Sequence, residues 1–351
     1  MKAKNWNLIV LLGTGVILLL IAVFTIIIDP FLHFHKPLEG LEYPLKDERY
    51  QNDGIARWYE YDAIITGTSM TQNFKTSEFD ERMGVVSIKT AYSGASFHEL
   101  SRSIERALKY NPDVKIVLCS MDGTRIIYEA DADEYEGYPS YLYDNNPFND
   151  VNYVLNKEVI PKTLAVLNYT RAGEKTPSMD EYGSWGYGRV YGPDAVFATL
   201  SQLPEIEEEI VLADEDRKMI RENLEKNFLE LALKHPETEF YFFLPPYSIC
   251  YWEAIYNTKQ LNAQLEAQKE AVEVVLQAEN VHVFDFSYRV DIVSDLNNYM
   301  DSLHYSPEIN SEILRAISEG EGELTLENYL QYYEEIKELY MNYDYSTIRA
   351  E

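Results

Sequence analysis

A hydroxyl group stands where a buried strand gives way to a helix, a position suited to nucleophilic catalysis. Ser69 follows an apolar run and lies in the turn Gly67-Thr68-Ser69. Such turns carry either a nucleophilic serine or a phosphate-binding loop. The phosphate loop is excluded because the pattern Gly-x-x-x-x-Gly-Lys-Ser/Thr is missing and Lys75 comes too late. A plain helix-capping role for the two hydroxyls remains the alternative.

A serine becomes nucleophilic when a base takes its proton, and a histidine oriented by a carboxylate is the usual base. Of the six histidines, only His304 follows the last predicted strand and has an aspartate, Asp301, three residues before it. This spacing lets the carboxylate hold Nδ1–H while Nε2 points toward Ser69. We therefore predict Ser69 as nucleophile, His304 as base and Asp301 as its orienting group. The alternative is that Asp301 caps a turn and His304 packs against Tyr305.

The elements that must position these residues alternate between apolar strands and amphipathic helices. Such alternation predicts an α/β fold with a central parallel sheet between two helical layers. The carboxyl ends of parallel strands share one edge, so Ser69 and the loop that carries His304 are expected at that edge. The predicted strands are 62–67, 85–91, 114–122, 239–246 and 281–286, and the predicted helices are 71–83, 97–110, 214–234 and 258–278.

The N-terminal segment predicts a membrane span. Residues 8–28 carry no charge and have the length that crosses a bilayer, so residues 1–28 are expected to form an anchor. Lys2 and Lys4 precede the span, which by the positive-inside rule places the N-terminus in the cytoplasm and the rest outside. A cleaved signal peptide is the rival, but no small-x-small cleavage site follows the apolar run.

Composition divides the remainder into expected parts. Residues 29–60, rich in proline, are expected to be a stalk, and 61–318 the catalytic α/β domain. An insertion at 125–200 has about ten tyrosines and is expected to form its own helices or a lid. Its tyrosines suit contacts with sugars and suit the packing of a polar subdomain equally. The tail, 319–351, is expected to dock as a helix with Leu326, Leu330 and Ile336 facing the body.

Charge and cysteine usage exclude several classes of partner. The formal net charge of −29 repels nucleic-acid phosphates, so no nucleic-acid partner is expected. His and Cys spacings that would bind a metal are missing from the sequence, and we expect neither a metal nor another cofactor. Cys119 and Cys250 lie in apolar runs and are expected to be buried thiols, although a space outside the cytoplasm permits a disulfide.

The two motifs together resemble the SGNH/GDSL hydrolase superfamily. In that family a Gly-Asp-Ser block ends the first strand and a late Asp-x-x-His completes the triad; here the blocks are "GTSM" at 67–70 and "DSLH" at 301–304. The resemblance is closest to the membrane-anchored branch that includes the teichoic-acid D-alanyl transfer protein and the alginate O-acetyltransferases. It covers roughly 61–318, leaves the insertion unassigned, and implies a three-layer, flavodoxin-like domain.

The resemblance also implies an oxyanion hole. Its donors would be the backbone N–H groups of Ser69 and of Gly94, which follows the second strand. The family's third donor is an Asn after the third strand, but the matching stretch "CSMD" has Met121 there. Asp122, Ser120 or a residue from the insertion would have to substitute, or the hole is weaker than in free esterases.

Three functions remain open from the sequence. The first is an extracytoplasmic, membrane-anchored serine esterase or O-acyltransferase that acts on cell-surface polysaccharide through an acyl-serine. The second is a catalytically silent SGNH-like module that binds a glycan or a membrane-bound O-acyltransferase through the insertion and the acidic surface. The third is a solute-binding domain with two lobes.

Overall fold

The computed structural model describes residues 3–133, 135, 137–204 and 206–349. The described chain divides into two compact units, which are considered separately. Unit 1 comprises Met1–Tyr59 and Gly137–Ser178, and unit 2 comprises Glu60–Glu136 and Met179–Glu351. This division differs from the expected one, because the middle part of the 125–200 insertion, residues 137–178, joins the N-terminal segment.

Unit 2 is a mixed α/β structure built on a six-stranded sheet, which confirms the predicted fold class at that level. The strand order is β2-β1-β3-β4-β5-β6; the first five strands are parallel and β6 is antiparallel to β5. Because the chain reverses direction across the sheet between β1 and β3, a crevice is expected at that switch point. The strands are β1 (Ala63–Thr66), β2 (Ser87–Lys89), β3 (Ile116–Ser120), β4 (Glu239–Leu244), β5 (Val281–Asp285) and β6 (Glu323–Leu324).

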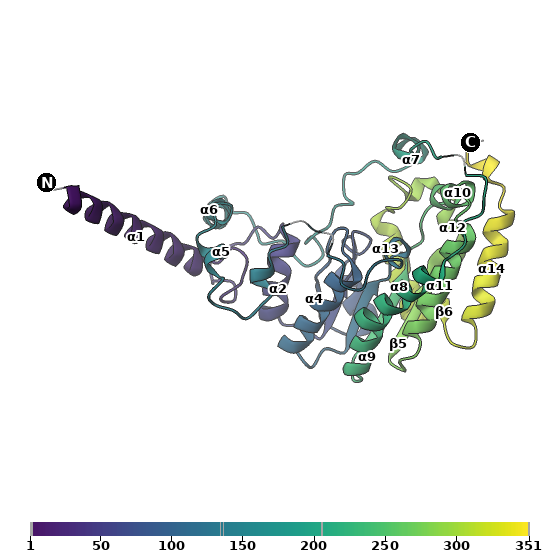
Figure 1. The fold of residues 1–351 in the computed structure, drawn as a ribbon, viewed down its shortest axis with the longest axis horizontal. Helices are drawn as coiled ribbons and strands as arrows, with labels where there is room; N and C mark the ends of the chain where they lie inside the picture. Colours follow the sequence, from purple (N-terminus) through teal and green to yellow (C-terminus); the bar gives the residue numbers. More distant parts are fainter. Residues whose placement is uncertain (1–2, 134, 136, 205, 350–351) are drawn as a thin grey trace. The chain divides into compact units, whose positions relative to one another are not determined.

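Apolar side chains on the strands form the core of this unit. All four residues of β1 are buried, as expected for a strand covered on both faces. In Figure 1 the continuous helix formed by α8 and α9 lies between α4 and α11, and α3 contacts α13. The helices of unit 2 are α3 (Thr76–Met83), α4 (Phe97–Tyr110), α7 (Pro193–Thr199), α8 (Asp214–Leu224), α9 (Glu230–Lys234), α10 (Ile249–Asn257), α11 (Leu261–Val275), α12 (Val290–Val293), α13 (Pro307–Glu319) and α14 (Tyr329–Asn342).

Two predicted helices have different bounds in the structure. The helix expected at 71–83 begins only at Thr76, because the preceding residues form successive tight turns, such as Thr71 N–H to the Thr68 carbonyl at 3.1 Å. The helix expected at 258–278 is α11, preceded by the separate α10. The helix expected at 214–234 is continuous but contains a π-helical stretch, Glu225–Leu229, between α8 and α9.

The C-terminal tail docks through tyrosines rather than leucines. Tyr333 and Tyr340 are buried in α14, and their hydroxyls donate to the Asp285 carboxylate at 3.0 Å and the Ser287 carbonyl at 2.6 Å. Leu326 and Leu330, predicted to face the body with Ile336, are 58% and 55% exposed, whereas Ile336 is buried. The prediction was wrong for the two leucines. The hydrogen bonds of Tyr333 and Tyr340 at the end of β5 turn the tyrosine-bearing face of α14 toward the sheet instead.

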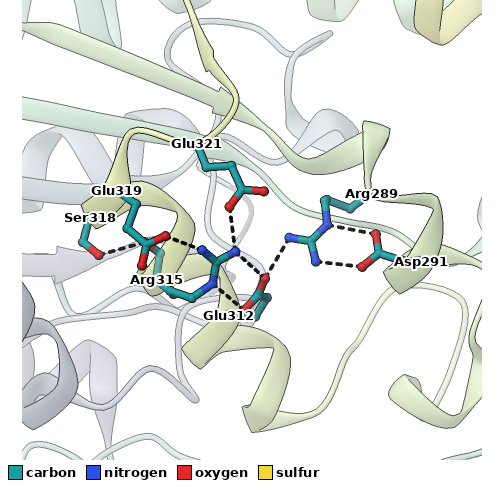
Figure 2. Close-up of polar contacts among 7 residues, drawn as sticks. All are labelled: Arg289, Asp291, Glu312, Arg315, Ser318, Glu319 and Glu321. Atoms are coloured by element: carbon teal, nitrogen blue, oxygen red, sulfur yellow. Dashed lines mark hydrogen bonds and ion pairs between the residues drawn. The ribbon is translucent and has the colours of Figure 1, made fainter.

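An ion-pair network holds α13, the helix that begins three residues after His304. Figure 2 shows Arg315 between Glu312, Glu319 and Glu321. Arg289 also donates to Glu312, at 2.9 Å. Arg315 contacts both oxygens of Glu312, at 2.7 and 2.9 Å. The other members of the network are Asp291, Glu319 and Glu321.

Unit 1 begins with α1 (Ala3–Ile28), whose length and composition fit a membrane span. The carboxylate of buried Asp29 ends this helix by accepting the backbone N–H groups of His33, Phe34 and His35 at 3.0, 2.7 and 3.1 Å. The segment expected to be a stalk contains a helix with a largely buried face. The other helices of unit 1 are α2 (Glu48–Trp58), α5 (Val151–Val154) and α6 (Val159–Arg171).

Candidate active site

Ser69 lies in the sharp turn that follows β1. Gly67 has φ = +136°, and a Cβ there would lie 2.7 Å from the Thr71 methyl and would also collide with Ser120 Oγ. Glycine is therefore required for β1 to end this close to β3. The Thr68 N–H donates to Ser120 Oγ at 3.2 Å, so the turn is tied to the neighbouring strand.

His304 and Asp301 lie in the loop between β5 and α13. Asp301 Oδ1 accepts the backbone N–H groups of Leu303 and His304, each at 2.8 Å, and Oδ2 lies 2.8 Å from His304 Nδ1. Burial alone would raise the pKa of Asp301, but the hydrogen bonds from His304 and Leu303 outweigh it and hold that pKa below its ordinary value. The carboxylate therefore stays ionised and fixes the imidazole.

The structure brings the three predicted side chains together. His304 Nε2 lies 2.8 Å from Ser69 Oγ, across 235 positions in the sequence. The resulting order, hydroxyl to imidazole to carboxylate, is the arrangement in which a histidine can accept the serine proton. Ser69 is partly exposed, as are the imidazole at 27% and the carboxylate at 22%, so a substrate can reach the hydroxyl.

A cavity of about 260 Å³ opens over Ser69 at the switch point between β1 and β3. Segments that follow all five parallel strands contribute to it, in accord with the rule that parallel sheets bind ligands at their carboxyl edge. It is lined by Thr68, Ser69, Met70, Ser93, Gly94, Asp122, Thr124, Arg125, Tyr247, Leu303 and His304.

Two residues that line this cavity, Ser69 and Gly94, were predicted to supply the oxyanion hole with their backbone N–H groups. Within the described residues, neither the N–H of Ser69 nor that of Gly94 donates a hydrogen bond to another protein group. Gly94 has φ = +66°, a conformation that glycine adopts without strain. Unsatisfied donors beside a nucleophile are what an oxyanion hole requires.

Asp122 has a different position from the one that an oxyanion donor would need. Its carboxylate is 4% exposed and accepts hydrogen bonds from three hydroxyls, those of Thr68 at 2.9 Å, Ser120 at 2.7 Å and Tyr247 at 2.8 Å. Because it accepts from these hydroxyls, Asp122 holds the Ser69 turn in place, and Ser120 is occupied in the same task. Met121 is fully buried and supplies no donor either.

Sequence reasoning missed several residues around the site. Trp185, from the far end of the insertion, donates its Nε1–H to the Ser69 carbonyl at 3.2 Å. Arg125 lines the cavity, donates to Tyr128 Oη at 2.8 Å, and has its backbone carbonyl held by buried Asn223 at 3.1 Å. The sequence signal for Trp185 was its place among glycines in "GSWGYG". No local sequence pattern indicated Arg125.

Other reactive groups lie away from this chemistry. Cys119 and Cys250 are both buried and form no disulfide within the described chain. Burial raises the pKa of Cys119 well above its ordinary value and that of Cys250 to about 11, so neither thiol is activated. Among the described residues, no group of three or more His, Cys, Asp or Glu side chains is arranged to hold a metal ion.

Comparisons with known proteins add little to this description. No protein-family model matches the chain, and no curated protein matches it. A solved structure described provisionally as a platelet activating factor from Streptococcus pneumonia is similar over 77% of this chain and 88% of that chain, with 10% identity and a TM-score of 0.38. A likeness this distant carries no argument about activity. The assignment of an activity therefore rests on the geometry of the site.

Proposed function

We propose that this chain is a serine esterase or O-acyltransferase that works through an acyl-Ser69 intermediate. The observation that carries the proposal is the continuous contact from Ser69 Oγ to His304 Nε2 and from His304 Nδ1 to Asp301, each at 2.8 Å. A cavity above the hydroxyl, lined by Ser69 and by Gly94, whose backbone N–H groups have no acceptor among the described residues, also supports the proposal.

The proposed reaction has two halves. In the first, His304 Nε2 takes the proton of Ser69 Oγ as Oγ bonds to the acyl carbon, and the carbonyl oxygen becomes an oxyanion facing the N–H groups of Ser69 and Gly94. The imidazolium then gives its proton to the departing alkoxide, which leaves as an alcohol. In the second half His304 deprotonates water or a hydroxyl, which takes the acyl group and restores Ser69.

The fold supports placing this chemistry in the SGNH-like group. The parallel strands follow the doubly wound order 2-1-3-4-5, the flavodoxin-like order. All six strands within the described residues belong to one sheet, which gives no support to a two-lobed solute-binding architecture. With two N–H donors in place of the family's three, the hole is expected to stabilise the oxyanion less than in free esterases.

The proposed setting is the outer face of a membrane. The apolar α1 supports a single-pass anchor with the N-terminus in the cytoplasm and unit 2 outside. The proposed acceptor is a hydroxyl of a cell-surface polysaccharide, in keeping with the membrane-anchored branch that the sequence resembles. A membrane-bound O-acyltransferase would be a suitable acyl donor partner for an enzyme held at this surface.

A fluorophosphonate probe tests the assignment directly, because it reacts only with an activated serine. The full chain in detergent is expected to be labelled at Ser69, and Ser69→Ala and His304→Ala are expected to lose the label. Ser318→Ala, which removes a hydroxyl on α13 bonded only to the Arg315 carbonyl at 2.8 Å, is the control and should label normally. Equal labelling of wild type and Ser69→Ala would refute the nucleophile.

A folded wild-type chain that takes no label at all would instead favour the silent glycan- or partner-binding module. The observation that keeps this candidate open is the buried Met121 in place of a third oxyanion donor. Binding of an O-acetylated polysaccharide, measured by co-sedimentation and unchanged in His304→Ala, would then be the expected result.

A further inference from the structure

The last part of the insertion contacts both members of the Ser69–His304 pair. We propose that Trp185 is a positioning residue that holds these two side chains in register, and that residues 180–186, named here the clamp segment, form part of the active site. This inference deepens the proposed function and depends on it.

The clamp segment is fastened at its first residue. The Asp180 carboxylate accepts hydrogen bonds from Thr76 Oγ1 at 2.9 Å and from the N–H and Oγ of Ser77 at 2.9 and 2.6 Å, at the N-terminus of α3. Burial alone would raise the pKa of Asp180, but the hydrogen bonds from Ser77 and Thr76 and the nearby charge of Lys89 outweigh it and hold that pKa below its ordinary value. An ionised aspartate therefore anchors the segment.

A buried lysine ties the same point to the turn that follows the nucleophile. Lys89, at the end of β2, is 1% exposed, and its Nζ donates to the carbonyls of Gln72 at 2.6 Å, Phe74 at 2.9 Å and Asp180 at 3.1 Å. Three carbonyl oxygens on one ammonium group fix the spacing between the Ser69 turn and the clamp segment.

The other end of the segment is fastened to the nucleophile turn itself. Asn73 Oδ1 accepts hydrogen bonds from Ser184 Oγ at 3.2 Å, Trp185 N at 3.0 Å and Gly186 N at 2.8 Å. Gly186 also abuts the start of α13, because a Cβ there would lie 2.5 Å from Pro307 Cγ. The segment is thus confined between the turn after β1 and the helix after His304.

Trp185 makes the contacts that matter for the chemistry. Its Nε1–H donates to the Ser69 carbonyl at 3.2 Å, and its ring meets the His304 imidazole edge to face, with centroids 5.3 Å apart and planes at 90°. One rigid side chain therefore restrains the nucleophile's backbone and the rotation of the base together. Because hydroxyl and imidazole come from opposite ends of unit 2's sequence, their alignment depends on such a bridge.

The separate contacts of Trp185 can be removed one at a time. Trp185→Phe keeps an aromatic ring against His304 and loses the hydrogen bond to Ser69; Trp185→Leu loses both. Tyr187→Ala is the matched control, because Tyr187 is 64% exposed and lies two residues away. The readouts are the rate of fluorophosphonate labelling, kcat and KM for a small acetyl ester, and the melting temperature.

The expected result is a loss in kcat with KM little changed, since the acetyl ester does not need Trp185 for binding. Labelling and kcat should fall roughly 10- to 100-fold in Trp185→Leu, in keeping with a small misplacement of reacting groups. Trp185→Phe should recover most of that loss, and Tyr187→Ala should match wild type. Equal rates in wild type and Trp185→Leu would overturn the inference while leaving the serine assignment intact; an unlabelled wild type would instead overturn the proposed function.

A second measurement keeps Trp185 in place, so it tests the inference even if Trp185→Leu does not fold. The chain has four tryptophans, at positions 6, 58, 185 and 252. Incorporation of 5-fluorotryptophan gives one ¹⁹F resonance for each, and Trp185→Phe identifies the one of interest. Phosphonylation of Ser69 should shift the Trp185 resonance and leave that of Trp252, which stacks on Tyr340, in place. An unmoved Trp185 resonance in fully labelled protein would contradict the clamp.

Discussion

Two parts of the 125–200 insertion, residues 137–178 and 179–200, both contain tyrosines but have different tasks. Residues 137–178 belong to unit 1, where Tyr153 and Tyr143 donate to the Asp29 carboxylate at 2.7 Å and the Arg49 carbonyl at 2.8 Å. Residues 179–200 belong to unit 2, where the clamp segment contacts Ser69 and His304. One part stabilises the segment that follows α1; the other supports the candidate active site.

The difference shows that composition does not assign a role to such an insertion. In both parts aromatic residues bury a ring and use a polar atom on a backbone or carboxylate partner. The role is decided by which partner that atom reaches, and the partners are distant in sequence. Changes on the unit 2 side should therefore alter reactivity, and changes on the unit 1 side should alter stability alone.

The largest expected effect is the loss of kcat when Asp301, in unit 2, is changed to Asn. Asp301→Asn keeps the shape of the side chain but removes the charge that fixes His304 with Nε2 toward Ser69. We expect kcat to fall on the order of 10⁴-fold with the melting temperature nearly kept. Stopped-flow ester hydrolysis measures it, and a loss below tenfold would mean that Asp301 does not orient the base.

A smaller loss of activity is expected from releasing the clamp segment at Asn73. Asn73→Ala leaves the N–H groups of Trp185 and Gly186 without their acceptor, at a cost of roughly 1–3 kcal/mol for each buried donor. Labelling should slow by about 10- to 100-fold as the alignment loosens. Asn73→Asp, which retains the acceptor oxygen, should label much faster than Asn73→Ala; equal rates for the two would weaken the role of this contact.

The matching change on the unit 1 side should spare activity. Tyr153→Phe removes the hydroxyl that donates to buried Asp29, a hydrogen bond to a charged group, and should lower the free energy of unfolding of unit 1 by roughly 1.5–3 kcal/mol. Limited proteolysis across a denaturant series measures it. Fluorophosphonate labelling should stay at the wild-type rate, and a loss comparable to that of Asn73→Ala would break the separation between the two parts.

The smallest effect is expected from the exposed charge network on α13. Hydrogen bonds from Arg315 hold the pKa of Glu312 at about 2, against an ordinary 4.5 and in spite of partial burial. Because this pKa is depressed in the folded state, the network's contribution is complete above pH 4.5 and is lost as the pH falls through about 2.

Glu312→Gln should therefore lower the free energy of unfolding by at most about 1 kcal/mol at pH 7, since its partners are partly exposed. The difference from wild type should shrink below pH 4.5, as urea unfolding at pH 7 and pH 3 can show. A difference that grew toward acid pH would assign the effect to another group. Labelling at pH 7 should be unchanged.

Much of the fold follows from local patterns. Apolar runs such as 114–122 and the amphipathic 97–110 are long and periodic, and the mixed α/β structure with a mostly parallel sheet confirms them. Predictions from hydrophobic periodicity failed where a few tertiary contacts decide the local structure. Leu326 and Leu330 lost their predicted burial to tyrosines that hydrogen-bond the end of β5, and the helix expected from Thr71 gave way to turns held against β3.

The sequence by itself determined which groups could react: a serine after a glycine turn, a histidine three residues after an aspartate, and an apolar segment long enough to cross a bilayer. The catalytic roles of Ser69, Asp301 and His304 stay predictions. Only the tertiary structure decided that Ser69 and His304 lie 2.8 Å apart, that Asp122 accepts rather than donates, and that Trp185 bridges the pair. Hydrogen bonds act over about 3 Å, whereas the residues that make these three contacts are separated by 54, 116 and 235 positions, and no local pattern encodes such pairings.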